Sequence, residues 1–403
     1  MMRPIRETVP LDEAVRLIAG ATAPIERTER LDIREADGRV LAADVVSAAD
    51  VPPFSRAAMD GYAVIAEDTF GAGQFHPKAL ACVEKVYTGE VPAKAVARGE
   101  CTEIATGAPM PGGADAVVMI EETEKDDLGR VRVFSPVYPG QNVGGRGADI
   151  VAGQTVLRAG DVLNPSRIGA LAAIGVLDVA VYARPRVAIL STGNEIVDPG
   201  RPLAPGQIYD INKFTLGAVI AAHGGVPVPH ATAPDTHEAL DQALDACARE
   251  DLIIFSGGSS VGERDLILDA VARRGEVIFH GIAVKPGKPT LFGVISGKPV
   301  LGMPGYPTSC LSNSYMLLVP ALRRMARLPP AHIRTITLPL GQRIVSTTGR
   351  HQFYTVRIAD GTAMPAFKAS GDITSMSQAD GYIEIPAQTD IVEKGERVEV
   401  RLF

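Results

Sequence analysis

The chain contains no tryptophan, and aromatic residues make up only 5% of its 403 residues. Proteins that bind single-stranded nucleic acid stack the bases on aromatic side chains, so a stacking surface of that kind is poorly supplied here. The formal net charge of −7 also disfavours binding along a phosphate backbone, although it leaves room for a local basic pocket. Nucleic acid is therefore not expected as a partner.

Cysteine is scarce as well. The four cysteines are Cys82, Cys101, Cys247 and Cys310. They are far apart and form no CxxC pair, which excludes a zinc ribbon and a CxxC redox pair. We expect buried, reduced thiols. The seven histidines show no metal-ligand spacing, and His230 and His280, near predicted strand ends, are expected to be structural.

Targeting segments, long apolar runs and common catalytic signatures are also missing. Residues 1–7 lack the apolar core of a signal peptide, and the most apolar stretch, residues 168–182, is too short to span a bilayer. A cytoplasmic location is therefore expected. The sequence contains no P-loop, no GxSxG, no HExxH and no GxGxxG followed by a suitable acid.

The length of the chain predicts several domains. Residues 183–328 alternate short apolar strands with helices, which predicts an α/β/α domain with a mainly parallel sheet. Short strands between turns predict a β-rich domain over residues 51–147 and a C-terminal β-barrel over residues 329–403. The remaining residues, 1–50 and 148–182, are expected to form a linking domain, with helices over residues 11–19 and 167–174.

Ligands of parallel sheets bind beyond the carboxyl ends of the strands. The predicted strands cover residues 187–190, 226–230, 252–255, 277–280 and 300–302, and the predicted helices cover residues 208–222, 235–249, 266–274 and 308–327. Asp235 with Glu238 resembles a capping box for the second of these helices. The loops after residues 190, 255 and 302 are therefore the places to look for a site.

Two of these loops contain backbone N–H groups that can bind an anion and carboxylates that can bind a cation. Thr192 and Gly193 can turn backbone N–H groups toward an anion, while Glu195 can hold Mg²⁺. The alternative for this first loop is a solvated turn. The second loop is rich in glycine and serine and ends in carboxylates: Ser256, Gly257, Gly258, Ser259, Gly262, Glu263 and Asp265. Its glycines allow close approach to an oxyanion, and the carboxylates make sense if Mg²⁺ bridges them to phosphate.

A lysine turn and a further loop complete the pattern. Lys285 and Lys288 flank Pro286-Gly287, and two neighbouring ammonium groups are unfavourable without a counter-anion such as phosphate. An exposed basic turn is the alternative. The loop over residues 302–309 includes Pro304, Gly305 and Ser309 and could hold a phosphate or a pterin. Together these segments predict a pocket for a phosphorylated ligand with a divalent cation.

Long ordered segments of the chain resemble one family. They are PPFSRAAMDGYAV, TGAPMPGGADAVVMIEET, GQNVGGRGADI, RPRVAILSTGNEIV, GQIYDINKF, SGGSSVGERD, KPGKPTLFG, GMPGYPTSC and GRHQF. In this order, and over essentially the whole chain, they are similar to the molybdopterin molybdenumtransferase family, which includes bacterial MoeA and the E domains of gephyrin and its plant counterpart.

The resemblance implies a homodimer of four-domain subunits, with residues 1–50 and 148–182 forming a linker and dimerisation domain and residues 183–328 binding molybdopterin. The implied reaction is Mg²⁺-dependent insertion of molybdate into adenylyl-molybdopterin with release of AMP. The substrates would be molybdate and adenylyl-molybdopterin, and the molybdopterin adenylyltransferase would be a partner.

The resemblance also implies roles for particular residues. Those matching family positions tied to activity or Mg²⁺ are Asp60, Thr106, Glu195, Asp235 and Asp265. Lys285 and Lys288 match lysines near molybdate and the nucleotide-linked phosphate. Arg350 and Ser370 are similar to a molybdate site in the fourth domain, and Arg146 and Asp149 would reach the cleft of the partner subunit. Taken alone, Asp60-Gly61 reads as a tight turn.

The chain departs from the family pattern at Arg56-Ala57, at Ser259 and at Tyr306. At the position of Tyr306 the family usually has asparagine. The last change removes an amide and adds bulk in a ligand loop. The main alternative function is a paralogue that binds molybdopterin or the finished cofactor as a carrier or scaffold; it is disfavoured because a carrier has no need of Mg²⁺ ligands. Adenylation of molybdopterin, the preceding step, is disfavoured because this chain has three extra domains.

Overall fold

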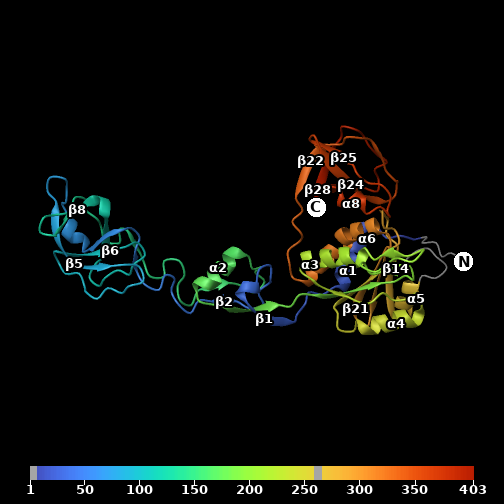
Figure 1. Cartoon of the computed structure of the whole chain (residues 1–403), viewed down its shortest axis with the longest axis horizontal. Coiled ribbons are helices and arrows are strands. Elements are labelled where there is room, and N and C mark those ends of the chain that lie inside the picture. Colours follow the sequence, from blue (N-terminus) through green and yellow to red (C-terminus); the bar gives the residue numbers. More distant parts are fainter. Residues whose placement is uncertain (1–6, 258–265) are drawn as a thin grey trace. The chain divides into compact units, whose positions relative to one another are not determined.

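The computed structural model describes residues 7–257 and 266–403 (Figure 1). They fall into two compact units. The first comprises Met1–Glu29, Gly38–Val40 and Val181–Phe403, and the second comprises Arg30–Asp37 and Leu41–Ala180. The chain passes between them within β1 (Thr28–Asp32), around residues 38–40, and within β12 (Asp178–Tyr182).

The first unit is built on a six-stranded sheet. Its strands, in spatial order, are β16 (Val226–Pro229), β13 (Arg186–Ser191), β17 (Leu252–Ser256), β21 (Lys298–Met303), β20 (Leu291–Ile295) and β18 (Gly275–His280). The first four run parallel, while β20 runs antiparallel to both of its neighbours. The predicted α/β domain with a mainly parallel sheet is confirmed.

Different helices cover the two faces of this sheet because neighbouring residues of a strand point to opposite sides. In β13, Val187 and Ile189 pack in one core cluster with α1, α3, α6 and α7, whereas Ala188 and Leu190 pack in another with α4 and α5 (Figure 1). The helices are α1 (Leu11–Ala21), α3 (Asn212–Ala222), α4 (His237–Ala246), α5 (Leu266–Arg274), α6 (Pro307–Asn313) and α7 (Val319–Met325). The three layers follow from this alternation.

The single helix predicted over residues 308–327 is wrong in one respect. A π-helical turn, Ser314–Leu318, separates α6 from α7. Pro320 lies in the first turn of α7. Proline has no N–H and its ring clashes with the carbonyl four residues earlier, so the α-helical hydrogen bonds cannot continue unchanged through this point.

The strand β20 is absent from the sequence-based prediction. It forms a hairpin with β21 through a two-residue turn, in which Ser296 and Gly297 have φ values of 50° and 78°. Two positive φ values are typical of a type I′ turn. The antiparallel edge that results brings the segment between β18 and β20 to the same end of the sheet as the carboxyl end of β21.

A β-rich domain follows in the same unit. Its sheet has the order β19-β24-β26-β28-β22, with β25 paired to β24, and a separate ribbon joins β23 to β27. The strands are β19 (Val284–Lys285), β22 (Thr335–Pro339), β23 (Ile344–Val345), β24 (His351–Ala359), β25 (Thr362–Pro365), β26 (Gly381–Ile385), β27 (Ile391–Val392) and β28 (Arg397–Leu402); the short helix is α8 (Thr374–Ser377). The predicted C-terminal β-rich domain is confirmed.

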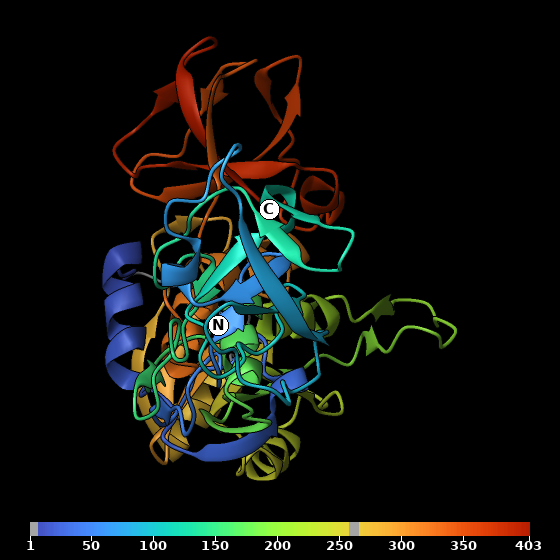
Figure 2. The ribbon, with the colours of Figure 1, turned by 90° about the vertical axis from the view of Figure 1, so that its left-hand side faces the viewer.

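Two contacts join this C-terminal domain to the α/β domain. The strand β19, from the α/β part of the chain, pairs in parallel with the start of β24. In addition, the rings of Phe353 and Tyr382 stack with centroids 3.9 Å apart and belong to the same core cluster as α6 and α7. A separate ribbon of β14 (Ile196–Val197) and β15 (Ile208–Tyr209) extends from the α/β domain (Figure 2).

The second unit contains another six-stranded sheet, in the order β7-β4-β6-β5-β9-β8. Its strands are β4 (Gly61–Val64), β5 (Lys78–Val86), β6 (Glu100–Ile104), β7 (Ala116–Met119), β8 (Thr123–Lys125) and β9 (Val131–Val133); smaller pairs join β2 (Val45–Val46) to β11 (Thr155–Leu157) and β3 (Arg56–Ala57) to β10 (Val143–Gly144). The predicted β-rich character is confirmed.

The helix α2 (Pro165–Ala173) of this unit begins as its sequence predicts. The side chain of Asn164 accepts a hydrogen bond of 2.9 Å from the backbone N–H of Arg167, and Pro165 occupies the first turn. Among the described residues of both units, no helix combines the length and the apolarity that crossing a bilayer requires.

Candidate functional site at the edge of the parallel sheet

The register of the central strands brings three loops to one edge of the sheet. Ser191 pairs with Ser256, and Ser256 pairs with Met303. Beyond these residues the loops stay close: the N–H of Thr192 donates to the carbonyl of Ser256 at 3.1 Å, and the N–H of Gly257 donates to that of Met303 at 3.4 Å. The predicted clustering of Thr192, Ser256 and Gly257 at the carboxyl edge therefore holds for the described residues.

At this edge of the sheet the backbone segments are closely packed, and two hydroxyl groups have no hydrogen-bond partner among the described residues. A Cβ atom on Gly257 would lie 2.6 Å from the carbonyl oxygen of Thr192, and one on Gly305 would lie 3.4 Å from the Cα of Gly257. The hydroxyls of Ser191 and Thr192 are buried and find no hydrogen-bond partner within the described ranges. Buried hydroxyls without partners are unfavourable, so a polar ligand at this edge would satisfy them.

Replacing Gly257 by alanine tests the tightness of this packing. Gly257 has φ of +101°, so alanine would be strained there and would also meet the carbonyl of Thr192. We expect a loss of about 2 kcal/mol or more in the free energy of unfolding. Gly297→Ala is the matched control, because Gly297 has φ of +78° but nothing within 4 Å of an added Cβ. Equal melting temperatures for the two variants would contradict the predicted clash.

Two carboxylates beside the first loop, those of Glu195 and Asp235, interact electrostatically. Burial raises the pKa of the Asp235 carboxyl, and the negative charge of Glu195 raises it further, while a hydrogen bond from the backbone N–H of Asn194 lowers it. The predicted helix-capping role of Asp235 is wrong. Thr236 caps α4 instead, with its hydroxyl accepting a hydrogen bond of 3.2 Å from the N–H of Ala239. Asp235 lies one residue before the cap, so its carboxylate is available next to Glu195.

The lysine turn is held from two sides. Lys285 donates a hydrogen bond of 2.8 Å from Nζ to the hydroxyl of Thr347, in the C-terminal domain. On the other side, the buried amide of Asn313 in α6 donates to the carbonyl of Gly287 at 3.0 Å and to the hydroxyl of Thr290 at 2.6 Å. Lys288 is half-buried in the same turn. The turn is thus positioned by side chains that the sequence-based prediction missed.

The C-terminal domain also brings predicted residues to this edge. Arg350 is half-buried and directly precedes His351, which pairs with Val284 of β19. The carbonyl of Ser370 accepts a hydrogen bond of 3.1 Å from the N–H of Thr308. The structure therefore joins the Ser370 turn to the 302–309 loop and the Arg350 segment to the lysine turn.

The 302–309 loop presents one large exposed side chain. Tyr306 is 65% exposed and lies against Gly371, whose added Cβ would be 3.6 Å from the ring. The loop carbonyl of Gly305 accepts a hydrogen bond of 2.8 Å from the amide of Asn212. Pro304 and Ser309, both predicted to bind cofactor, are buried, so the exposed surface of the loop is Gly305 and Tyr306.

An ion cluster around the buried Lys213 was not among the predicted site residues. Lys213 is 9% exposed, and its Nζ lies 2.7 Å from Oδ1 of Asp198 and 3.4 Å from Oδ2 of Asp210. The hydrogen bond from Lys213 lowers the pKa of Asp198. The spacing of Asp210 and Lys213 three residues apart is the only signal in the sequence. The neighbouring Asn212 keeps a buried amide oxygen without a partner in the described part of the chain.

Other predicted residues lie elsewhere. The predicted Gly258, Ser259, Gly262, Glu263 and Asp265 fall outside the described residues. Gly193 is buried with φ of +138° beside Glu195, whose own side chain is exposed.

Asp60 and Thr106 belong to the second unit, where the structure does bring them together. The N–H of Thr106 donates to Oδ1 of Asp60 at 2.7 Å. A cavity of about 200 Å³ adjoins Asp60 and is also lined by Lys85 and Glu103, which form an ion pair of 2.6 Å. In the same unit, Nε of Arg146 lies 2.6 Å from Asp50.

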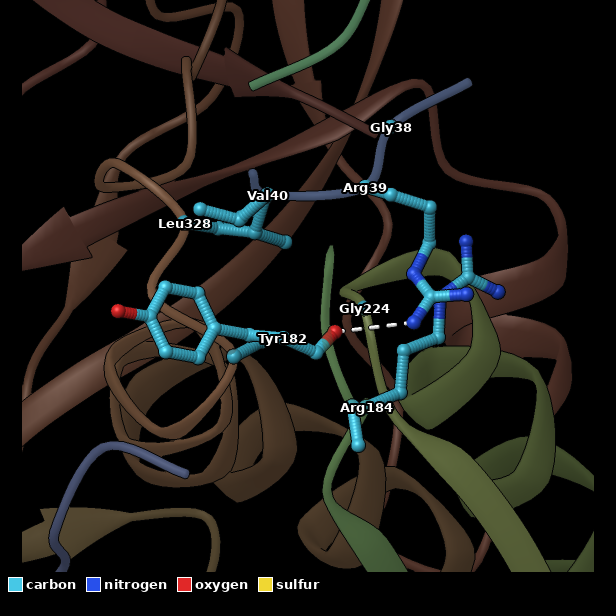
Figure 3. Close-up of a pocket in the computed structure, with 9 residues that line it drawn as sticks. Gly38, Arg39, Val40, Tyr182, Arg184, Gly224 and Leu328 are labelled. Atoms are coloured by element: carbon cyan, nitrogen blue, oxygen red, sulfur yellow. Dashed lines mark hydrogen bonds between the residues drawn. The ribbon is translucent and has the colours of Figure 1, made fainter. Parts of the chain in front are cut away.

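A second small cavity lies at the opposite end of β13 (Figure 3). Its lining includes Arg184 and Arg39, and Arg39 donates to the carbonyl of Tyr182 at 2.9 Å. Its volume is only about 10 Å³. That is room for roughly one water molecule. It is therefore no place for a nucleotide or a pterin.

Comparisons with known proteins agree with one another along the chain. Family models match consecutive segments: the MoeA N-terminal region (domains I and II) over residues 9–175, a molybdopterin binding domain over residues 188–324, and the MoeA C-terminal region (domain IV) over residues 337–403. The chain is 35% identical to molybdopterin molybdenumtransferase 2 of Mycobacterium tuberculosis over 91% of its own length and 93% of that protein. It is 33% identical to a molybdopterin biosynthesis protein of Methanocaldococcus jannaschii over the whole of both chains.

Solved structures match as well. A MoeA protein from Pyrococcus horikoshii superposes with a TM-score of 0.86 at 41% identity, covering 98% of this chain and 99% of that one. A second Pyrococcus horikoshii MoeA structure gives 0.82 at 32% identity, covering 98% and 100%. Because identity above 30% extends over nine-tenths of the sequence and the fold agrees over nearly all of it, the chain belongs to the molybdopterin molybdenumtransferase family, whose members serve molybdenum cofactor biosynthesis.

Proposed function

We propose that the chain inserts molybdate into adenylyl-molybdopterin and releases AMP, in a reaction that depends on Mg²⁺. The observation that supports this proposal is that carboxylates, which can bind a cation, and lysines, which can bind an oxyanion, lie at the same edge of one sheet. Glu195 and Asp235 follow β13 and β16 at that edge. The register from His280 through Leu291 to Gly302 brings the lysine turn to the same edge.

The carboxylates fit a magnesium ion. Glu195 and Asp235 are close enough for the charge of one to raise the pKa of the other, and a divalent cation would relieve this repulsion. With Glu263 and Asp265, they are the residues that we propose to hold Mg²⁺. When bound, Mg²⁺ would neutralise charge on the phosphoanhydride of the substrate.

The cationic groups fit the two substrate anions. We propose that Lys285 and Lys288 hold molybdate and the nucleotide-linked phosphate beside one another, with Arg350 and the turn at Ser370 completing the molybdate site. Thr347 orients the ammonium group of Lys285 by accepting its hydrogen bond. Fixed charges of this kind stabilise negative charge that develops on departing AMP. The dithiolene sulfurs of the substrate bind molybdenum themselves, so no protein nucleophile is required.

The backbone and hydroxyls at the strand ends fit the organic part of the ligand. We propose that Thr192, Gly193, Ser256 and Gly257, with Gly305, bind the pterin and its phosphate. The remaining proposed binding residues are Gly258, Ser259, Gly262, Pro304 and Ser309. The burial of Pro304 and Ser309 restricts their part to shaping the loop.

The second unit would contribute to the same reaction through assembly. We propose that the chain forms a homodimer in the cytoplasm. Residues 1–50 and 148–182 would form the linker and dimerisation domain, and residues 51–147 a β-rich domain. The edge with the carboxylates and the lysine turn would belong to the domains of residues 183–328 and 329–403. Asp60 and Thr106 are proposed as further residues for activity, and the molybdopterin adenylyltransferase as a partner.

The proposal is tested with purified protein and adenylyl-molybdopterin. AMP release is followed with and without molybdate, and with and without Mg²⁺. We expect release only when both are present. Tight binding of the pterin without any release of AMP would overturn the proposal and favour the carrier function.

The raised pKa of Asp235 predicts how pH affects magnesium binding. A carboxyl whose pKa is raised in the folded protein favours folding when protonated, and this contribution is lost as pH rises through that pKa. Mg²⁺ must displace the proton, so we expect MgCl₂ to raise the melting temperature more at pH 7.5 than at pH 5. In Asp235→Asn this difference should shrink. An equal rise at both pH values in the unsubstituted protein would contradict the prediction.

A further inference from the structure

Three potential metal ligands that have no part in the proposed reaction lie together. They are His230, Cys247 and Glu250, and one ligand atom from each lies within 4.8 Å of those of the other two. Cys247 ends α4, and Glu250 lies just before β17, at the end of that strand opposite to Ser256. His230 directly follows β16. The cluster therefore connects α4 to β16 and β17, two strands of the parallel sheet that flank β13.

One pair, which forms a sulfur–imidazole hydrogen bond in this structure, has the spacing that a tetrahedral metal requires. Sγ of Cys247 and Nε2 of His230 are 3.6 Å apart. Zinc bonds of about 2.3 Å to sulfur and about 2.05 Å to nitrogen, at a tetrahedral angle, place these atoms about 3.6 Å apart. A shift of roughly 1 Å would bring the carboxylate to the same ion.

One carboxylate oxygen of Glu250 forms an ion pair, and the other has no hydrogen-bond partner among the described residues. Its Oε1 lies 3.4 Å from Nη2 of Arg186. Its Oε2 is buried and has no hydrogen-bond partner in the described ranges, and the residue as a whole is only 5% exposed. A buried carboxylate oxygen left unpaired is costly, and coordination of a metal is one of the ways in which proteins remove that cost.

The charges and the donor atoms favour zinc. Cys247 is fully buried, and Nζ of Lys298 is already occupied by the backbone carbonyls of Ala248 and Glu250. A thiolate and a carboxylate together balance the two charges of a divalent ion, and the thiol proton passes to solvent on binding. The mixture of sulfur, imidazole and carboxylate suits Zn²⁺ rather than Mg²⁺, which prefers oxygen ligands alone.

We propose that His230, Cys247 and Glu250 bind one Zn²⁺ ion that ties α4 to the sheet. The half-buried position of His230 leaves the fourth ligand place to water. We assign the site a structural role, because none of its three ligands is among the residues proposed to bind substrate or Mg²⁺. It differs from the expectation that His230 is structural and that Cys247 is a buried, reduced thiol.

Cobalt titration of the full-length protein, first treated with chelator, tests the proposal. We expect about one Co²⁺ per chain with a thiolate-to-cobalt absorption band that Zn²⁺ abolishes. Cys247→Ala should lack the band, whereas Cys101→Ala, which removes another fully buried cysteine, should keep it. Should Cys247→Ala fold poorly, His230→Gln offers a substitution at a half-buried position, and it should weaken the affinity by more than the 10–100-fold that loss of an outer-shell partner costs.

Two results would overturn the proposal. The first is the absence of the band in the unsubstituted protein at a large excess of Co²⁺. The second is a band that persists in Cys247→Ala, since the metal would then bind elsewhere. Zinc should also raise the melting temperature of the unsubstituted protein by about 5 °C at 100 times its Kd, and leave that of His230→Gln unchanged.

Discussion

Asp235→Asn is expected to slow Mg²⁺-dependent AMP release by about 100-fold or more at saturating substrate. The substitution keeps the size of the side chain but removes the charge that we propose, together with Glu195, to bind Mg²⁺. Steady-state AMP release over a range of MgCl₂ concentrations would measure both the rate and the apparent affinity for Mg²⁺. We expect the loss in the rate to be accompanied by weaker Mg²⁺ dependence.

The control for this substitution lies on the same segment. Glu238→Gln removes an exposed carboxylate in the first turn of α4, three residues from Asp235. We expect it to change AMP release by less than about twofold, as surface substitutions usually do. Comparable losses in the two variants would show that the general charge of the helix start, and not the carboxylate pair, is responsible.

Lys285→Gln should have the second large effect. An ammonium group that neutralises an oxyanion in a partly enclosed site contributes several kcal/mol, so we expect kcat/KM for molybdate to fall by about 100-fold to 1,000-fold. Lys394→Gln, in an exposed turn of the C-terminal domain, is the control for loss of a positive charge. It should leave kcat/KM unchanged.

The hydrogen bond to Thr347 gives this prediction a finer test. Thr347→Val keeps the charge of Lys285 and removes only the hydroxyl that orients it. We expect a smaller loss, of about 10-fold, appearing mainly in the molybdate dependence. A loss in Lys285→Gln that is no larger than in Thr347→Val would contradict the assignment of the ammonium charge to the anion.

Most of the α/β domain could be predicted from the sequence because its signals are local. The first four residues of β17 (Leu252–Ser256) form a continuous apolar run, as strands buried on both faces do. In the second unit, Asn164 with Pro165 marks a helix start in the same local way. The loops after parallel strands necessarily share one edge of the sheet. For this reason the sequence alone suffices to group Thr192, Ser256 and Gly257 at one edge of the sheet.

Other features depend on contacts between distant residues. The strand β20 is recognisable only through its pairing with β21 and β18, because its Ser-Gly turn is a weaker signal than Asn-Gly. Asp235 and Thr236 are both suitable caps by sequence, but the Asp235 carboxylate accepts a hydrogen bond from the distant backbone N–H of Asn194, and Thr236 caps the helix. Nothing local to Asn313 indicates that it holds the turn at Gly287, 26 residues earlier.

The metal cluster shows the same limit most clearly. His230, Cys247 and Glu250 have no spacing that resembles a zinc motif, since two of the ligands bracket a helix end and the third follows a different strand. They come together because β16, β13 and β17 pair in parallel and α4 packs on β13 and β17. The absence of a motif in the sequence is therefore poor evidence against a metal site.

The central claim is that release of AMP and insertion of molybdenum are one coupled event at this edge. The measurement that tests it most directly follows both in a single turnover, by quantifying AMP and the activity of a reconstituted apo-molybdoenzyme from the same sample. The account predicts equal amounts of AMP and active cofactor, and loss of both in Asp235→Asn. Release of AMP without active cofactor, or active cofactor formed at an undiminished rate by that variant, would contradict it.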